Sequence, residues 1–282
     1  MKIQIIRRIW YQAERSKDIN GENKNMKRNI LYTALAALAM FALIIIILVT
    51  SIQIAIYGDS EYHFYQKEYE KYTVAEALDM KISDLMEVTE HMMAYLDGKE
   101  EKLSVEVPVE GKMQDFFNRQ DREHMADVQV LFHKGRIVRR IATVVAAFWL
   151  TVLYVCKKYL KIKNQQTGET RAKQWRMRTI IFRGYTTALG IFAAIVAVIV
   201  AACVRDFSAT FTLFHELIFT NKLWLFDEGT DYMIRMLPEG FFSDMAFRIL
   251  LTFGVGVIVL WILLFVWNYI RNRKNLHMIK NS

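Results

Sequence analysis

The sequence predicts an all-α membrane protein with four transmembrane helices. Four long apolar segments interrupt the chain, and each is close to or above the roughly 20 residues that a helix needs to cross a bilayer. Hydrophobic residues make up 54% of the chain and aromatic residues 13%, so a helical bundle in lipid accounts for most of the apolar content. The distribution of charge between the segments is the third observation, and it predicts the orientation.

The polar segments fall into two sets of opposite charge. Residues 1–29, 157–183 and 271–282 together hold 21 Lys and Arg against 4 Asp and Glu, a net charge of +17. Residues 58–140 and 205–248 hold 16 against 25, a net charge of −9. Basic flanks of membrane spans stay in the cytoplasm, so we expect both termini inside and both acidic segments outside. The net charge of the whole chain, +8, is then explained by basic cytoplasmic segments that set this orientation and are attracted to anionic lipid. Nucleic-acid binding is not needed to explain it.

These observations divide the chain into nine segments. In order, they are a cytoplasmic N-terminal segment 1–29, the first span 30–57, an extracytoplasmic cap 58–137, the second span 138–156, a cytoplasmic loop 157–178, the third span 179–204, an extracytoplasmic interfacial loop 205–248, the fourth span 249–270 and a cytoplasmic tail 271–282. Within the first segment, residues 3–11 have apolar positions opposite two arginines. That pattern is typical of an amphipathic helix in the membrane interface, and a simple basic tail is an equal alternative.

The cap has the pattern of a small, mainly helical unit. Apolar residues recur at nearly helical spacing between residues 78 and 96, and Asp97–Gly98 predicts the end of that helix. Residues 103–109 then alternate between apolar and polar ahead of Gly111, which predicts a short strand and a turn. The apolar positions of the helix are Leu78, Ile82, Leu85, Met86, Met92, Met93 and Leu96.

The 205–248 segment is almost as apolar as a span, yet it carries ionisable residues. Aromatic, amphipathic sequence of this kind lies in the membrane interface rather than across the bilayer. Its ionisable groups would therefore lie at the depth of lipid esters. The aromatic residues include Phe207, Phe211, Phe214, Phe219, Trp224 and Phe226, and the ionisable ones include His215, Glu216 and Asp231.

Two histidines are the candidate catalytic residues. His124 has Asp127 three residues later on the same helical face, and a carboxylate there could fix the tautomer of the imidazole. His215 stands between Phe214 and Glu216 in an apolar stretch, where desolvation would shift its pKa. From spacing alone, an ordinary histidine of the membrane interface is the commoner interpretation of each.

Other catalytic chemistries have less support in the sequence. The stretch from His215 to Phe219 begins like the zinc-binding motif HExxH, but phenylalanine replaces the second histidine. No other pair of histidines or cysteines has the spacing of a zinc site, and no G-x-S-x-G elbow is present. We therefore expect no metal site, no cofactor and no serine nucleophile.

Two motifs resemble a known family. The stretch from Phe214 to Trp224, followed by Asp231 and Met236-Leu-Pro-Glu239, is similar to a bacterial family of integral membrane proteins, as is the segment from Glu123 to Val128. The characterised members of that family are lipoprotein intramolecular transacylases, and the resemblance covers about residues 28–270. It implies that His124 and His215 are catalytic. It also implies substrate-binding or supporting roles for Glu123, Asp127, Phe214, Glu216, Asn221, Trp224 and Asp231.

The resemblance implies an activity that needs no nucleophile from the protein. The sn-2 acyl chain of a diacylglyceryl-cysteine lipoprotein would move to the α-amine of the same cysteine and give an N-acyl, lyso-form product. Two histidines can supply a general base for the amine and a general acid for the leaving oxygen. The implied partners are diacylglyceryl-modified lipoproteins and membrane lipid in the bacterial plasma membrane, with the protein acting as a monomer.

Two alternatives stay open at this stage. A non-enzymatic receptor or accessory subunit would use the acidic cap to bind a partner and would not need either histidine. A membrane lipid hydrolase would use the same histidines with water and would release fatty acid.

Overall fold

The computed structural model describes residues 2–167 and 177–280 of the chain. Most of these residues are helical, and four helices among them are long and apolar enough to cross a membrane. This confirms the predicted all-α, four-span fold class. The predicted loop 157–178 and tail 271–282 lie partly outside the described residues. The four candidate spans are Asn29–Tyr57, Arg119–Tyr159, Arg178–Arg205 and Glu239–Ile270.

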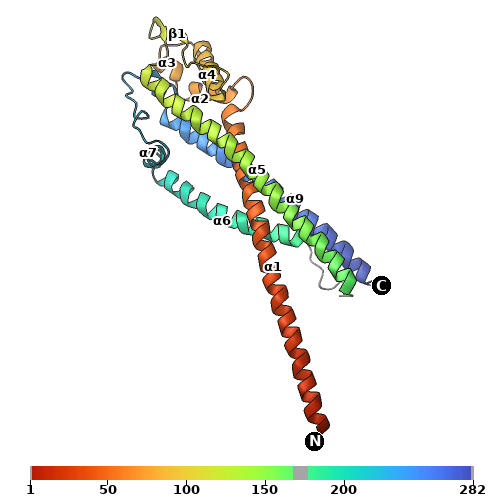
Figure 1. Cartoon of the computed structure of the whole chain (residues 1–282). Helices are drawn as coiled ribbons and strands as arrows, with labels where there is room; N and C mark the ends of the chain where they lie inside the picture. The colour runs from red at the N-terminus through yellow and green to blue at the C-terminus, as the bar shows by residue number, and fades with distance from the viewer. Residues whose placement is uncertain (1, 168–176, 281–282) are drawn as a thin grey trace. The chain divides into compact units, whose positions relative to one another are not determined.

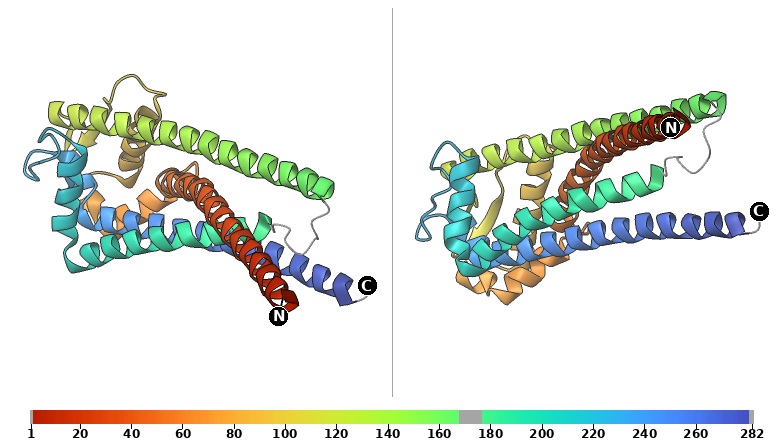
Figure 2. Two further views of the ribbon diagram at one scale, coloured as in Figure 1. Left: turned by 60° about the horizontal axis from the view of Figure 1, so that its bottom comes forward. Right: turned by 90° about the horizontal axis from the view of Figure 1, so that it is seen from below.

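The four long helices are joined by shorter elements, labelled in Figure 1 and seen from two further sides in Figure 2. The long helices are α1 (Lys2–Tyr57), α5 (Arg119–Thr167), α6 (Met177–Arg205) and α9 (Glu239–Lys280). The shorter elements are α2 (His63–Lys71), α3 (Val74–Ala77), α4 (Ile82–Asp97), β1 (Glu106–Val109), β2 (Lys112–Asp115), α7 (Phe207–Ile218) and α8 (Tyr232–Met236).

The chain forms two units, and the first comprises residues 1–44, 143–191 and 259–282. Helices α1 and α6 cross closely in this unit, because a Cβ atom on Gly184 would lie only 2.7 Å from the Cβ of Ala36. Small residues let membrane helices approach in this way, where lipid offers no hydrophobic driving force. Ala36, Leu153 and Ile180 form one buried cluster in this unit.

The second unit comprises residues 45–142 and 192–258 and contains the cap. The apolar positions predicted for the cap are confirmed, because all seven belong to its core. Leu78, Leu85, Met92, Met93 and Leu96 are buried, and Ile82 and Met86 are partly buried against them. Met233 and Met236 of α8 and Phe241 of α9 join the same core, so the second acidic segment packs with the first.

The predicted end of the cap helix is confirmed at Gly98. This residue has a φ of 78°, and its amide donates to the carbonyl groups of Ala94 and Tyr95. Glycine adopts this left-handed conformation without the steric cost that a side chain would add, which is why it commonly ends helices.

The predicted strand forms one half of a β-hairpin. Strand β1 pairs antiparallel with β2, with Val109 opposite Lys112. The connecting residues Glu110 and Gly111 have φ values of 50° and 74°, as the type I′ turn of a two-residue hairpin requires. The second strand was not predicted, because residues 112–115 read Lys-Met-Gln-Asp and lack an alternating apolar pattern.

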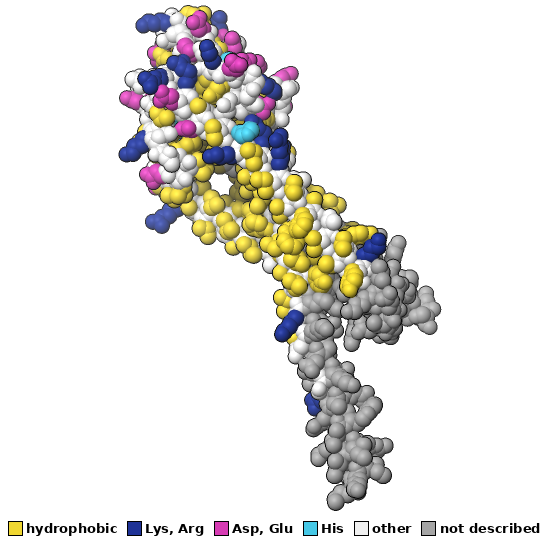
Figure 3. All heavy atoms as spheres, viewed as in Figure 1, with side chains coloured by type: hydrophobic (Ala, Val, Ile, Leu, Met, Phe, Trp, Pro, Cys, Tyr) yellow, Lys and Arg dark blue, Asp and Glu magenta, His cyan; other side chains and the backbone are white. Residues whose placement is uncertain are grey.

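The surface reflects the two environments that these elements face. On the face shown in Figure 3, acidic and basic side chains gather over the cap elements, whereas hydrophobic side chains cover the long helices. Large apolar residues are exposed along the spans, such as Val198 of α6 at 71% and Val144 of α5 at 69%. Such exposure is expected of surfaces that face lipid.

Candidate active site

Helix α7 carries His215 and begins at a strong capping residue. The Asp206 side chain accepts a hydrogen bond from the amide of Ala209 at 2.9 Å, the usual N-cap interaction for a helix. His215 lies in the last turn of α7, and it is buried on a helix whose other face is largely exposed.

A hydrogen bond fixes the tautomer of His215. Its Nδ1 lies 2.8 Å from the backbone carbonyl of Phe211, one turn earlier. A carbonyl oxygen can only accept, so Nδ1 carries the proton and donates it to Phe211. In the neutral imidazole, Nε2 therefore keeps a lone pair and can accept a proton from a substrate. Burial lowers the pKa of His215 from its ordinary value of 6.5, which favours this neutral form.

Helix α5 carries His124, and its first turn is held by a reciprocal capping interaction. The amide of Asp121 donates to the side-chain oxygen of Asn118 at 3.0 Å, and the amide of Asn118 donates to the Asp121 carboxylate at 2.9 Å. Each side chain thus satisfies a backbone N–H that the helix itself leaves unpaired. His124 lies one turn later and is 6% exposed.

The two histidines lie in one site. Their ring centroids are 6.2 Å apart and the rings are inclined by 31°. Phe219 lies beside both rings, with its centroid 5.2 Å from that of His124 and 5.6 Å from that of His215. Nδ1 of His124 is buried and has no hydrogen-bond partner among the described residues. The sequence places these histidines 91 positions apart, so only the fold brings them together.

An aromatic wall surrounds the pair. Besides Phe219, four further aromatic rings lie within 5.5 Å of one of the two imidazole centroids. They are Phe211 at 4.3 Å, Trp224 at 5.1 Å and Phe214 at 5.4 Å from His215, and Phe226 at 5.3 Å from His124. Such a wall excludes water and strengthens electrostatic interactions within the site.

The loop between α7 and α8 carries part of this wall, and helix α5 holds the loop. Asn221 donates from Nδ2 to the carboxylate of Asp127 at 2.8 Å. The backbone carbonyl of Asn221 then accepts a hydrogen bond from Nε1 of Trp224 at 3.1 Å. Asp127 therefore positions the loop through Asn221, and no hydrogen bond joins it to His124 among the described residues, in contrast to the sequence-based expectation.

Asp231 holds the far end of the same loop. It is 5% exposed, and its carboxylate accepts from the side chain of Asn118 and from the amide of Asp227. Gln120 adds a third link, because its side-chain amide donates to the carbonyl groups of Leu223 and Leu225. Asn118, Gln120 and Asp121 were not among the predicted site residues. The Asn-x-x-Asp spacing at the start of a helix could have indicated two of them.

Two predicted residues, Glu123 and Glu216, do not face the histidines, and Phe214 contacts His215 only at a ring edge. Glu123 is exposed and pairs with Arg119 at 2.7 Å, while Glu216 is exposed on the outer face of α7. Both are next to a histidine in sequence, and adjacent residues on a helix point about 100° apart. Phe214 is 48% exposed and contacts His215 only through an edge-to-face arrangement of the rings. In the part of the chain that the structure describes, no cluster of three or more His, Cys, Asp or Glu could hold a metal ion.

Comparisons with a family model and with solved structures point to the same family. The family model of the lipoprotein intramolecular transacylase Lit matches residues 37–242. The solved structure of the membrane-integral lipoprotein intramolecular transacylase Lit from Bacillus cereus aligns with a TM-score of 0.61 at 21% identity, over 88% of this chain and 99% of that one. A variant of that protein, with one histidine replaced by arginine, aligns with a TM-score of 0.63 at 20% identity, over 90% of this chain and 99% of that one. None of the curated proteins matches. Because the family model covers well over half of the sequence, this chain belongs to the lipoprotein intramolecular transacylase family.

Proposed function

We propose that this protein moves the sn-2 acyl chain of a diacylglyceryl-cysteine lipoprotein onto the α-amine of the same cysteine, with His215 as general base and His124 as general acid. One observation carries the assignment of roles: Nδ1 of His215 donates to the carbonyl of Phe211. This leaves Nε2 as the proton acceptor, in a ring whose centroid is 6.2 Å from that of His124.

The reaction balances without a protein nucleophile. The substrate amine attacks the sn-2 ester carbonyl, so an N–C bond forms and the bond from carbonyl carbon to the sn-2 oxygen breaks. Nε2 of His215 takes the proton that the amine loses. His124 receives this proton from the His215 ring and donates it to the sn-2 oxygen, so both rings end neutral, as they began. General acid–base assistance of this kind typically contributes about 10²–10⁴-fold to a rate.

The surroundings of the pair suit a substrate that stays in the membrane. The aromatic wall offers acyl chains an apolar surface beside the histidines and shields the reacting groups from competing water, and a substrate bound against it would have its ester and amine held together. The outer face of α7 exposes Leu213 at 52% and Leu217 at 76%, as expected of a helix that lies against lipid. We place the site on the extracytoplasmic side of the plasma membrane and both termini in the cytoplasm, because the cap and the α7 loop are the acidic segments.

The residues of the loop have positioning roles in this proposal. Asp127, Asn221 and Asp231 hold the segment that carries Trp224 and Phe226 against the two rings. In this proposal the protein acts as a monomer. It needs no cofactor, because the substrate supplies both the nucleophile and the acyl group.

A defined peptide substrate separates transfer from hydrolysis. Purified protein, given a diacylglyceryl-cysteine peptide, should yield a product of unchanged mass with one O-linked and one N-linked chain. The same peptide with an acetylated α-amine should not react. If the acetylated peptide loses an acyl chain and free fatty acid appears, the protein is a hydrolase and the proposed transfer is wrong.

A further inference from the structure

A run of basic residues lies at the cap-side end of the second span. The predicted orientation of the chain does not account for basic residues at this end. Lys134, Arg136, Arg139 and Arg140 fall within seven residues of α5, and no Asp or Glu occurs from residue 128 to residue 168. Basic residues beside a span usually mark the cytoplasmic side, but the cap side is the acidic side of this protein. These residues therefore need a different explanation.

The length of the charge-free part of α5 sets the depth of this run. Residues 141–156 contain no charged side chain, with Arg139 and Arg140 before them and Lys157 and Lys158 after them. Sixteen helical residues span about 24 Å, slightly less than the roughly 30 Å of a hydrocarbon core. Long basic side chains at both ends can reach outward, so Arg139 lies at the level of the lipid headgroups.

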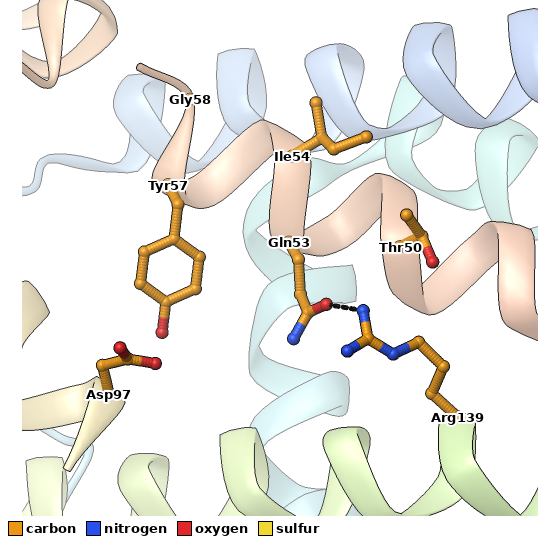
Figure 4. A pocket seen from close by; sticks show the side chains of 7 residues that line it. All are labelled: Thr50, Gln53, Ile54, Tyr57, Gly58, Asp97 and Arg139. Carbon is orange, nitrogen blue, oxygen red and sulfur yellow. Dashed lines mark hydrogen bonds between the residues drawn. The ribbon is translucent and has the colours of Figure 1, made fainter. Parts of the chain in front are cut away.

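A pocket of about 440 Å³ opens beside Arg139. One wall is the last part of α1, where Thr50 and Gln53 offer polar groups and Ile54 forms an apolar rim that is 53% exposed. Arg139 donates a hydrogen bond to the side-chain oxygen of Gln53, which holds the guanidinium at the wall (Figure 4). The pocket therefore combines polar groups with one exposed apolar residue, Ile54.

The charges around this pocket favour an anion. Asp97 is the acidic residue that lines it, and the Tyr57 hydroxyl points toward its carboxylate in Figure 4. Two cations already pair with Asp97, namely Arg136 at 3.5 Å and Lys99 at 2.9 Å. Arg139, which also lines the pocket, is a third cation, so positive charges outnumber the single carboxylate here. A guanidinium presents several N–H groups in a fixed plane that matches the oxygen atoms of a phosphate.

We propose that this pocket binds the phosphate headgroup of an anionic phospholipid. The substrate of acyl transfer does not fit, because diacylglyceryl-cysteine has no phosphate and its amine is cationic. Inorganic phosphate shares the headgroup chemistry, but the depth of Arg139 and the exposed side chain of Ile54 favour a ligand with acyl chains. Basic pockets between membrane helices recognise anionic headgroups by the same combination of charge and depth.

Native mass spectrometry of the full chain, released from vesicles of equal parts phosphatidylglycerol and phosphatidylcholine, tests this site. The unaltered protein should retain phosphatidylglycerol in preference to phosphatidylcholine. Arg139→Gln should reduce that retention roughly fivefold or more, the effect of removing one basic residue near a membrane surface. Arg140→Gln removes the same charge from the next, exposed residue and is the matched control, which should retain the lipid.

A second variant keeps the test informative if Arg139→Gln does not fold. Ile54→Trp leaves every charge in place but fills the mouth of the pocket, and it should also lose the lipid. Excess inorganic phosphate should leave retention unchanged, and displacement by phosphate would show a phosphate site instead of a lipid site. Equal retention of the two lipids by the unaltered protein, or full retention by a folded Arg139→Gln or Ile54→Trp protein, would overturn the proposal.

Discussion

At the scale of single residues, the imidazole tautomer underlies the different roles that we propose for the two histidines. His215 is fixed by the carbonyl of Phe211, whereas Nδ1 of His124 has no partner among the described residues. The proposed base, His215, is thus held in one orientation before the substrate arrives. The ring of His124 is constrained mainly by packing against Phe219 and Phe226. In the proposed mechanism, His215 is therefore a preorganised base, whereas His124 gains a hydrogen-bond partner for Nδ1 only when the substrate binds.

Replacing either histidine by alanine should abolish most of the activity. We expect a loss of about 10²–10⁴-fold for each, and little further loss when both are replaced, because groups that act as one unit are not additive. Rates of peptide conversion, measured beside the amount of folded protein, provide the test. His63→Ala is the matched control, because His63 is exposed and pairs with Asp59 on the cap. Substantial activity in a folded His215→Ala protein would contradict the assigned base.

The titration of His215 provides a separate test of its state. Burial lowers the pKa of His215 below its ordinary value of 6.5, so the ring should stay neutral down to that pH and gain a proton only in more acidic solution. The rate at saturating substrate should therefore lose the contribution of this base only below pH 6.5. An NMR titration of labelled histidine, with the His215 signal identified by its absence in His215→Ala, measures the midpoint directly. A midpoint at or above 6.5 would show that the ring is not desolvated.

At the scale of elements, the first turns of α5 organise the site. Asn118 both caps this helix and donates to Asp231, so one side chain links the helix start to the end of the α7–α8 loop. Gln120 and Asp127 add links to the middle of that loop. The loop has little regular structure of its own, and its aromatic residues depend on these hydrogen bonds for their positions.

Two substitutions at Asn118 should separate its two roles. Asn118→Ser keeps a good N-cap but cannot reach Asp231 in the same way, so activity should fall while the stability of the protein changes little. Asn118→Ala loses both roles and should also cost about 0.5–2 kcal/mol of stability, the usual effect of removing an N-cap. Thermal unfolding and peptide turnover measure the two effects. Equal activity in Asn118→Ser and the unaltered protein would show that the link to Asp231 does not matter.

At the scale of the whole molecule, the charge distribution and the four spans make a topology that can be tested. Reporters fused after Gln166 and after Ser282 should read cytoplasmic, and one inserted at the exposed turn near Gly98 should read external. The reason is the net charge of +17 on one set of segments against −9 on the other. A cytoplasmic reading near Gly98 would reverse the orientation and place the active site on the other face of the membrane.

The sequence by itself determined the features that depend on local patterns. The four spans follow from hydropathy, because a bilayer imposes a minimum length on every crossing helix. The buried face of α4 follows from helical periodicity, and its end follows from Gly98. The family motifs also indicated both histidines, because these residues lie within short, distinctive stretches of sequence.

Only the tertiary structure decided which side chains meet. Asp127 lies three residues from His124 but bonds Asn221, and Glu123 and Glu216 are adjacent to the histidines yet are exposed, away from the two rings. Sequence proximity could not resolve these cases, because the direction of a helical side chain relative to a distant loop depends on how the helices and the loop pack. The 6.2 Å approach of His124 and His215 likewise joins two elements far apart in the chain. No local sequence pattern encodes that distance. It depends on the hydrogen bonds by which α5 holds the loop that follows α7.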